Sequence, residues 1–194
     1  MMDQLLEWDK DLLLYLNSLH VPWLDPVMLF LTKTFIWLPL YILLLFLVIR
    51  EYKKDSWMIL LGISFTILLT DQITSGFMKP YFARLRPSQE PELRNLLHLV
   101  NGYMGGKFGF ASSHAANTFG TASFFWLLFR HTKKWIIWLF LWAALMTYTR
   151  IYLGVHYPSD VIVGGLIGVV CGWVGFKLSL AVRRALERRR EIQP

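Results

Sequence analysis

The sequence predicts an all-α integral membrane protein, a helical bundle of about five transmembrane helices preceded by an amphipathic interfacial helix. Hydrophobic residues make up 55% of the 194 residues and charged residues 17%, less than the roughly 25% that is typical of soluble domains. The apolar residues form continuous runs that are long enough to cross a hydrocarbon core of about 30 Å. The basic residues form short clusters between these runs, which is the pattern of membrane topology.

The N-terminal segment, residues 1–26, is predicted to lie in the membrane interface. In helical geometry its leucines share one face, and the opposite face carries Asp3, Glu7, Lys10 and Asp11. Four charges are too many for a transmembrane helix, so an amphipathic helix parallel to the membrane surface is expected. Pro22 and Pro26 end this helix, because proline cannot continue the backbone hydrogen bonding.

Five apolar runs follow, and each is a predicted transmembrane helix. They cover residues 27–49, 57–78, 112–129, 135–149 and 158–182. Pro39 is expected to kink the first of them. The last run carries Gly164, Gly168 and Gly172, a four-residue spacing that allows membrane helices to approach closely.

The basic clusters predict how the chain is oriented in the membrane. Residues 50–54, 130–134 and 183–190 fall on one side if the five helices are correct, and the positive-inside rule makes that side the cytoplasm. The chain is then a single multi-pass membrane domain, residues 1–194, with a basic cytoplasmic tail at 183–194. The loop region 79–111 lies on the extracytoplasmic face.

Three groups of charged, hydroxyl and titratable residues fall on that extracytoplasmic face. Such residues are costly beside hydrocarbon, so we expect a function for them. Taken alone, the last group also fits an ordinary helix end with a capping aspartate and an interfacial arginine. The groups are Lys79 with Arg86, Ser112 and Ser113 with His114, and Arg150 with His156 and Asp160.

Together the three groups have the composition of a site for phosphoryl transfer. Lysine and arginine side chains can compensate the charge of the phosphate oxygens, so neither a metal nor another cofactor is expected. The helix start at Ser112 offers free backbone N–H groups to an anion. A neutral His156 can attack phosphorus while Asp160 fixes its tautomer. His114 can then protonate the leaving oxygen.

In these residues the chain resembles the type-2 phosphatidic acid phosphatase family of integral membrane lipid phosphatases. The signatures of that family are Lys-x6-Arg-Pro, Pro-Ser-Gly-His and Ser-Arg-x5-His-x3-Asp. The matching segments here are KPYFARLRP at 79–87, ASSH at 111–114 and TRIYLGVHYPSD at 149–160. Thr149, Ala111 and Ser113 depart from the pattern. Ala111 loosens the loop before the helix, and Ser113 adds a Cβ where backbone approaches phosphate.

The resemblance implies a metal-independent enzyme that hydrolyses a lipid phosphate or pyrophosphate through a phosphohistidine intermediate. It implies that His156 is the nucleophile, that Asp160 orients it and that His114 is the general acid. Arg84 is a further candidate for a phosphate or headgroup contact. The phosphate-binding residues that the resemblance implies are Lys79, Arg86, Arg150, Ser112 and Ser113.

The expected partner is a membrane lipid with a phosphate headgroup, held in the lipid bilayer. Nucleic acid is not expected despite a net charge of +7, because the basic residues do not form one patch. The small size favours undecaprenyl pyrophosphate as substrate, and with it a role in cell wall biogenesis at a bacterial plasma (inner) membrane. The alternatives are a phosphatidylglycerophosphate phosphatase and a lipid A phosphatase or phosphotransferase. A non-enzymatic alternative is an anion-binding transporter or scaffold, and the oligomeric state stays open.

Overall fold

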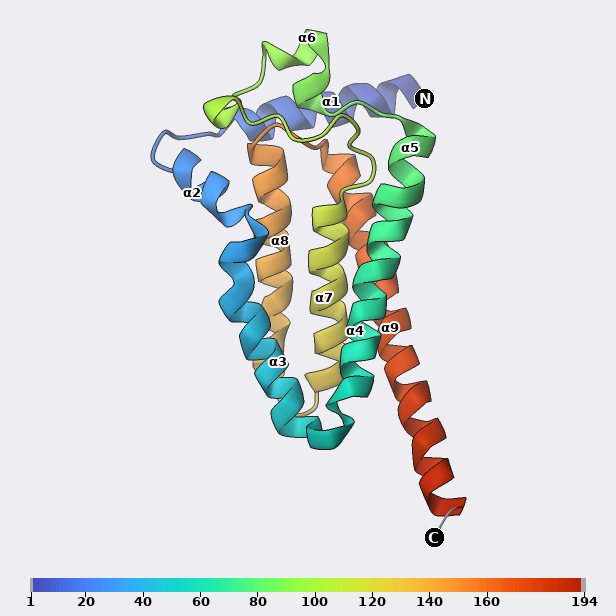
Figure 1. Ribbon diagram of the computed structural model, residues 1–194. Helices are drawn as coiled ribbons and strands as arrows, with labels where there is room; N and C mark the ends of the chain where they lie inside the picture. Colours follow the sequence, from blue (N-terminus) through green and yellow to red (C-terminus); the bar gives the residue numbers. More distant parts are fainter. Residues whose placement is uncertain (1, 193–194) are drawn as a thin grey trace.

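The computed structural model describes residues 2–192, and helices account for most of them (Figure 1). Residue 1 of the predicted interfacial segment and residues 193 and 194 of the predicted basic tail lie outside the described residues. The side chains of residues 2 and 189–192 lie outside them as well.

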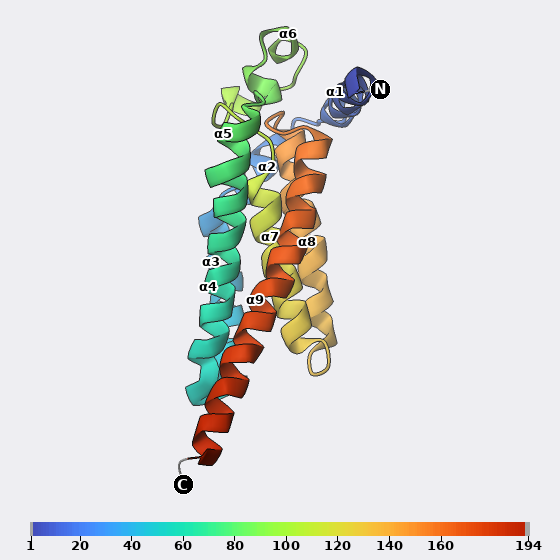
Figure 2. The same ribbon diagram turned by 90° about the vertical axis from the view of Figure 1, so that its right-hand side faces the viewer.

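Long helices run side by side along the bundle in both ribbon views (Figures 1 and 2). They are α3 (Leu38–Tyr52), α4 (Ser56–Asp71), α7 (Ser113–Phe129), α8 (Trp138–Tyr152) and α9 (Pro158–Ile192). The other helices gather at the end of the bundle that holds the N-terminus (Figure 1). These are α1 (Met2–Ser18), α2 (Asp25–Leu31), α5 (Lys79–Phe82) and α6 (Pro91–Arg94). The predicted all-α membrane bundle with an N-terminal helix outside it is confirmed.

The lengths and compositions of the helices fit a membrane protein. Within the described residues, three helical stretches are long and apolar enough to cross a membrane: Thr34–Phe82, Lys134–Tyr152 and Pro158–Arg188. The first of these reverses direction at Lys53, which has a φ of 47°, so α3 and α4 are two antiparallel rods (Figure 1). Helix α7 is 17 residues long and lies among the other long helices of the bundle.

The structure corrects the first predicted transmembrane helix, residues 27–49. This run is not one kinked helix, because α2 ends at Leu31 and Lys33 has extended backbone with φ −79° and ψ 123°. A short 3₁₀ turn, Thr34–Trp37, leads into α3. Pro39 stands in the first turn of α3, where its missing N–H costs nothing, so it starts the helix and does not kink it.

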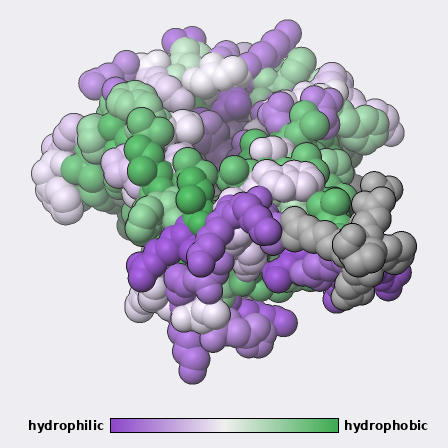
Figure 3. Space-filling view, turned by 60° about the horizontal axis from the view of Figure 1, so that its bottom comes forward, coloured by the Kyte–Doolittle hydropathy of each residue, from purple (hydrophilic) through white to green (hydrophobic). Residues whose placement is uncertain are grey.

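Hydrophilic side chains gather at the end of the bundle opposite α1, which faces the viewer in Figure 3. The turns after α3 and α7 and the last turns of α9 lie at this end (Figure 1). They carry the predicted basic clusters 50–54 and 130–134 and the described part of 183–190. Apolar surface surrounds this end of the bundle (Figure 3).

Helices α7 and α9 approach each other with almost no side chain between their backbones. A Cβ built on Gly164 would contact the carbonyl oxygen of Ser112, and one on Gly168 would contact the carbonyl oxygen of Ala116. Gly172 meets the backbone of α7 one turn further along. The glycine spacing in the sequence is therefore a helix-packing surface, as predicted.

We predict that Gly168→Ala destabilises the protein, because the new methyl group would need α7 and α9 to separate. Its Cβ would lie 2.9 Å from the backbone nitrogen of Gly120 and still closer to the carbonyl oxygen of Ala116. Overpacking of this kind costs about 1–3 kcal/mol, so the midpoint of thermal unfolding in detergent should fall. Val170→Ala, at an exposed position of the same helix, is the matched control. Equal midpoints for the two variants would contradict the prediction.

Candidate active site

A histidine and an aspartate form a buried pair where α9 begins. Nδ1 of His156 lies 3.1 Å from Oδ2 of Asp160, and the side chains are 1% and 0% exposed. The backbone N–H of Tyr157 also donates to Oδ2 at 3.1 Å. Pro158 starts the helix, so Asp160 stands in its first turn and His156 lies two residues before the helix. The predicted proximity of these two side chains is confirmed.

The start of α7 meets the same turn of α9. The backbone N–H of Ser112 donates to the carbonyl oxygen of Asp160 at 2.9 Å. Ser112 is the N-cap of α7, where its hydroxyl accepts a hydrogen bond from the N–H of Ala115 at 3.4 Å. This contact places the start of α7, and with it His114, beside the His156–Asp160 pair.

Lys79 approaches the start of α7 from the helix that continues α4. This continuation is a π-helical segment, Gln72–Met78, and Lys79 follows it directly. Its ammonium group donates to the hydroxyl of Ser113 at 2.6 Å and to that of Ser75 at 3.1 Å. Ser113 is one of the departures from the family signature, and the structure gives its hydroxyl a role as the oxygen that holds Lys79.

Arg86 is buried against the loop 105–109. Its Nε donates to the carbonyl oxygen of Phe108 at 3.1 Å and its Nη1 to that of Val155 at 3.4 Å. Burial lowers the pKa of Arg86 to about 10, and the nearby Arg150 lowers it too. Gly109 lets this loop approach the His156–Asp160 pair closely, because a Cβ at this position would lie 2.9 Å from Oδ2 of Asp160.

Arg150, at the end of α8, is 2% exposed. Its Nη1 donates to the hydroxyls of Thr32 at 2.5 Å and Tyr103 at 3.3 Å. Its Nε is buried without a hydrogen-bond partner among the described residues. A buried donor without a partner is costly, and an oxygen atom of a bound anion would remove that cost.

The three cations predicted to bind phosphate share one property. Their hydrogen-bond partners are hydroxyl or carbonyl oxygens, and within the described residues none of the three forms an ion pair with a carboxylate. The three cations therefore add positive charge beside the His156–Asp160 pair, and no carboxylate of the described residues forms an ion pair with them. Burial lowers the pKa of His156 well below its usual 6.5, and Arg86 and Arg150 lower it further. The imidazole is thus neutral at pH 7, the form that a nucleophile needs.

Arg84 is arranged differently from these three cations. It was a candidate for a phosphate or headgroup contact, but its guanidinium forms ion pairs with Asp160 and with Asp9 of α1. Two carboxylates neutralise its charge, so the structure does not favour a role in phosphate binding.

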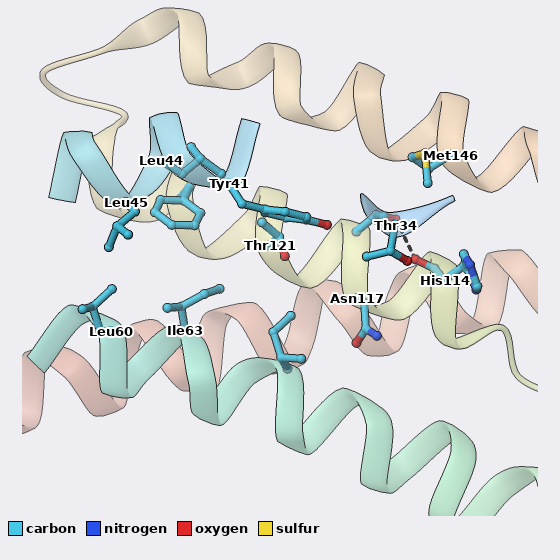
Figure 4. A pocket seen from close by; sticks show the side chains of 13 residues that line it. Thr34, Tyr41, Leu44, Leu45, Leu60, Ile63, His114, Asn117, Thr121 and Met146 are labelled. Atoms are coloured by element: carbon cyan, nitrogen blue, oxygen red, sulfur yellow. Dashed lines mark hydrogen bonds between the residues drawn. The ribbon is translucent and has the colours of Figure 1, made fainter. Parts of the chain in front are cut away.

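A cavity of about 410 Å³ extends from His114 into the bundle between α3, α4 and α7. Figure 4 shows His114 at one end of the cavity and Leu44, Leu45 and Leu60 toward the other. The lining is mainly apolar, and its polar groups include Asn117 and Thr121 of α7. The cavity has the size of a small-molecule site, which is about 300–1,000 Å³.

Sequence reasoning missed several residues that complete the site. Asp9, Thr32 and Tyr103 each contact an arginine of the site from a distant part of the chain. No spacing rule connects them to the motifs. A clue to Gly109 was the run of glycines at 102–109, since glycine is favoured where a backbone must approach another group closely.

The chain matches the model of the PAP2 superfamily over residues 59–184. It is 41% identical over 177 residues to a lipid A 4'-phosphatase of Bacteroides thetaiotaomicron, covering 90% of this chain and 78% of that protein. It is 36% identical to a lipid A 4'-phosphatase of Porphyromonas gingivalis, covering 94% and 77%. An undecaprenyl-diphosphatase of Sulfolobus acidocaldarius is 29% identical, with coverage of 90% and 78%.

The fold is also similar to that of a solved structure. The crystal structure of Aquifex aeolicus LpxE superimposes on this fold with a TM-score of 0.63 and 28% sequence identity, covering 86% of this chain and 93% of that one. The family match includes all three signature segments, from Lys79 to Asp160. The chain therefore belongs to the PAP2 superfamily and is one of its membrane-bound lipid phosphatases.

Proposed function

We propose that the protein removes the 4'-phosphate of lipid A, or of a lipid with the same headgroup chemistry, through a phosphohistidine on His156. The observation that carries this proposal is the buried His156–Asp160 pair beside three cations without carboxylate partners. A phosphate monoester supplies the negative charge that this arrangement lacks.

The proposed reaction has two steps. Nε2 of His156 attacks phosphorus, the bond from phosphorus to the lipid oxygen breaks, and His114 gives that oxygen a proton. Water then attacks the phosphohistidine, His114 takes a proton from it, and phosphate leaves. Throughout, Nδ1–H of His156 donates to Asp160, which stabilises the imidazole while it carries positive charge.

The phosphate oxygens are proposed to lie between Lys79, Arg86 and Arg150. The unpartnered Nε of Arg150 supports this role, because it is a donor without an acceptor. The N–H of Ser113 at the start of α7 is a further donor at a positive helix end. The hydroxyl of Ser112 accepts a hydrogen bond at the helix cap, and its O–H can still donate to a phosphate oxygen.

The relatives favour lipid A over the undecaprenyl pyrophosphate that the sequence led us to expect. The two lipid A 4'-phosphatases are 41% and 36% identical to the chain, whereas the undecaprenyl-diphosphatase is 29% identical. Similarity therefore supports the alternative substrate better than the first choice. Water is the proposed acceptor, and transfer to a second lipid is the competing reaction.

The cavity beside His114 is proposed to hold an acyl chain of the substrate. It begins at the site and continues between α3 and α4 among leucine and isoleucine side chains (Figure 4). Apolar lining of this kind favours hydrocarbon over water. The headgroup would then stay at the phosphate site while a chain lies within the bundle.

We further propose that the site faces the outside of the plasma membrane. It lies at the α1 end of the bundle, and the basic clusters lie at the other end (Figures 1 and 3). The positive-inside rule assigns the basic end to the cytoplasm.

The test of function is phosphate release in EDTA from lipid A, undecaprenyl pyrophosphate and phosphatidylglycerophosphate. We expect the largest kcat/KM for lipid A, activity that survives chelation, and a loss of more than about a thousandfold in His156→Ala, because the nucleophile is gone. Activity that disappears with EDTA would contradict the metal-free mechanism. A better rate with undecaprenyl pyrophosphate would restore the first choice of substrate. Phosphate found on a second lipid would identify a transferase.

Leu45→Trp should weaken binding of long acyl chains, because the indole ring narrows the far end of the cavity. Each displaced methylene group costs about 0.8 kcal/mol, so KM for the natural lipid should rise while kcat/KM for a short-chain analogue stays unchanged. Leu141→Trp, on an exposed face of α8 away from the cavity, is the control. An equal rise in KM for both chain lengths would argue against an acyl-chain site.

The orientation can be tested by labelling intact spheroplasts with a membrane-impermeant thiol reagent. Asn95→Cys, at an exposed position after α6, should react before lysis. Lys134→Cys, exposed at the other end, should react only after lysis. The native Cys171 is 2% exposed and should add little background. The reverse order of labelling would invert the proposed topology.

A further inference from the structure

Arg84 is held by carboxylates, in contrast to Lys79, Arg86 and Arg150. Its Nη1 donates to Oδ1 of Asp160 at 3.0 Å, and its Nη2 donates to Oδ2 of Asp9 at 2.8 Å. The guanidinium also lies over the ring of Tyr157, with 3.8 Å between Cζ and the ring centroid. Arginine in such a planar, stacked and doubly paired arrangement has a fixed orientation.

The contacts of Asp160 show what this orientation does. Oδ2 faces Nδ1 of His156 and accepts from the N–H of Tyr157. Oδ1 accepts from Arg84 and from no other group among the described residues. Arg84 therefore determines how the carboxylate is turned toward the histidine, although it does not touch the histidine through any hydrogen bond.

Asp9 comes from α1, the helix that lies across the end of the bundle (Figure 1). Besides Arg84, it binds the first turn of α9: its Oδ1 accepts from the backbone N–H of Ser159 at 2.8 Å, and its Oδ2 accepts from the hydroxyl of Ser159. A carboxylate at a helix N-terminus is favourable. The side chain is only 10% exposed, so its charge is weakly screened by water.

The charges of these residues suggest why Asp9 is needed. Arg84 and Asp160 alone sum to zero, which would leave nothing to balance the positive charge that His156 gains when its Nε2 is phosphorylated. Asp9 adds a second negative charge, so Arg84, Asp160 and Asp9 together carry one net negative charge on the Nδ1 side of the imidazole, apart from the charges of Lys79, Arg86 and Arg150. That charge favours the phosphorylated state over the free enzyme.

We propose that Arg84 and Asp9 are positioning residues for the nucleophile: Arg84 orients Asp160, and Asp9 returns to Asp160 the negative charge that Arg84 would otherwise neutralise. This inference rests on the proposed function of His156. It gives α1 a part in the reaction, because this helix brings Asp9 to the first turn of α9, where it binds Ser159, 150 positions later in the chain.

The test compares Asp9→Asn, Arg84→Gln and the double variant with the wild type. Asparagine keeps the shape and the acceptor oxygen of Asp9 but removes its charge. We expect kcat for Asp9→Asn to fall about tenfold to a hundredfold, the effect of losing one charge-assisted interaction. KM and the inhibition constant of inorganic phosphate should stay unchanged, because the phosphate-binding cations are intact. In the Arg84→Gln background, Asp9→Asn should have little further effect, since the two residues act together.

Three controls make the result decisive. Asp11→Asn removes an exposed carboxylate from the same helix and should leave kcat unchanged. Asp9→Glu keeps the charge and should retain most of the activity, which a purely steric role for Asp9 would not allow. Thermal unfolding in detergent reports whether a variant is folded.

Three results would overturn the proposed role of Arg84 and Asp9. Normal kcat in Asp9→Asn, or effects of the two substitutions that multiply in the double variant, would overturn the proposal. A loss of phosphate affinity in Arg84→Gln would also overturn it, because Arg84 would then be a phosphate ligand. His156→Ala is measured alongside: if it stays active, the proposed nucleophile is wrong, whereas an inactive His156→Ala with a fully active Asp9→Asn refutes only the role of Asp9.

Discussion

The backbone contact between α7 and α9 is the constraint on which the rest of the site depends. Asp160, Gly164, Gly168 and Gly172 recur every four residues along one face of α9, and the carbonyl oxygen of Asp160 accepts from the N–H of Ser112. Because glycine has no side chain, α7 can come close enough for that bond to form. The packing of two membrane helices thus sets the separation of the second and third signature segments.

Within the described residues the buried cations of the candidate site have no carboxylate partner, so the site is costly to build without an anion. Arg150 and Arg86 are 2% and 8% exposed. Their hydrogen-bond partners are neutral oxygens, and Nε of Arg150 has no partner among the described residues. Desolvated charges without an opposite charge are unfavourable. Binding a phosphate group recovers part of that cost, and a neutral ligand would not. The same burial keeps His156 neutral, which is the form that the proposed nucleophile needs. Binding of phosphate is the role that we propose for the cations.

The signature segments made much of the candidate site predictable from the sequence. What they could not predict depends on contacts that form only in the folded protein. The sequence predicted that Asp160 lies close to His156, because Pro158 was expected to open the last helix and to place Asp160 in its first turn. The sequence left the role of Arg84 open, because spacing from Lys79 and Arg86 does not show which partner a long side chain contacts. The break in residues 27–49 was missed as well, because the run is apolar enough as a whole to be taken for one helix, although Thr32, Lys33 and Thr34 interrupt it where the backbone of Lys33 is extended.

The sequence by itself determined the membrane bundle, the candidate residues of the site and the family resemblance, because hydrophobic run length, charge clusters and motif spacing are local properties of the chain. Only the tertiary structure decided the rest. It brought Asp9, Thr32 and Tyr103 to the arginines of the site, and it paired Arg84 with two carboxylates, unlike Lys79, Arg86 and Arg150. It also formed the cavity beside His114. These contacts join residues far apart in the chain, and their positions follow from how helices pack, which no local pattern records.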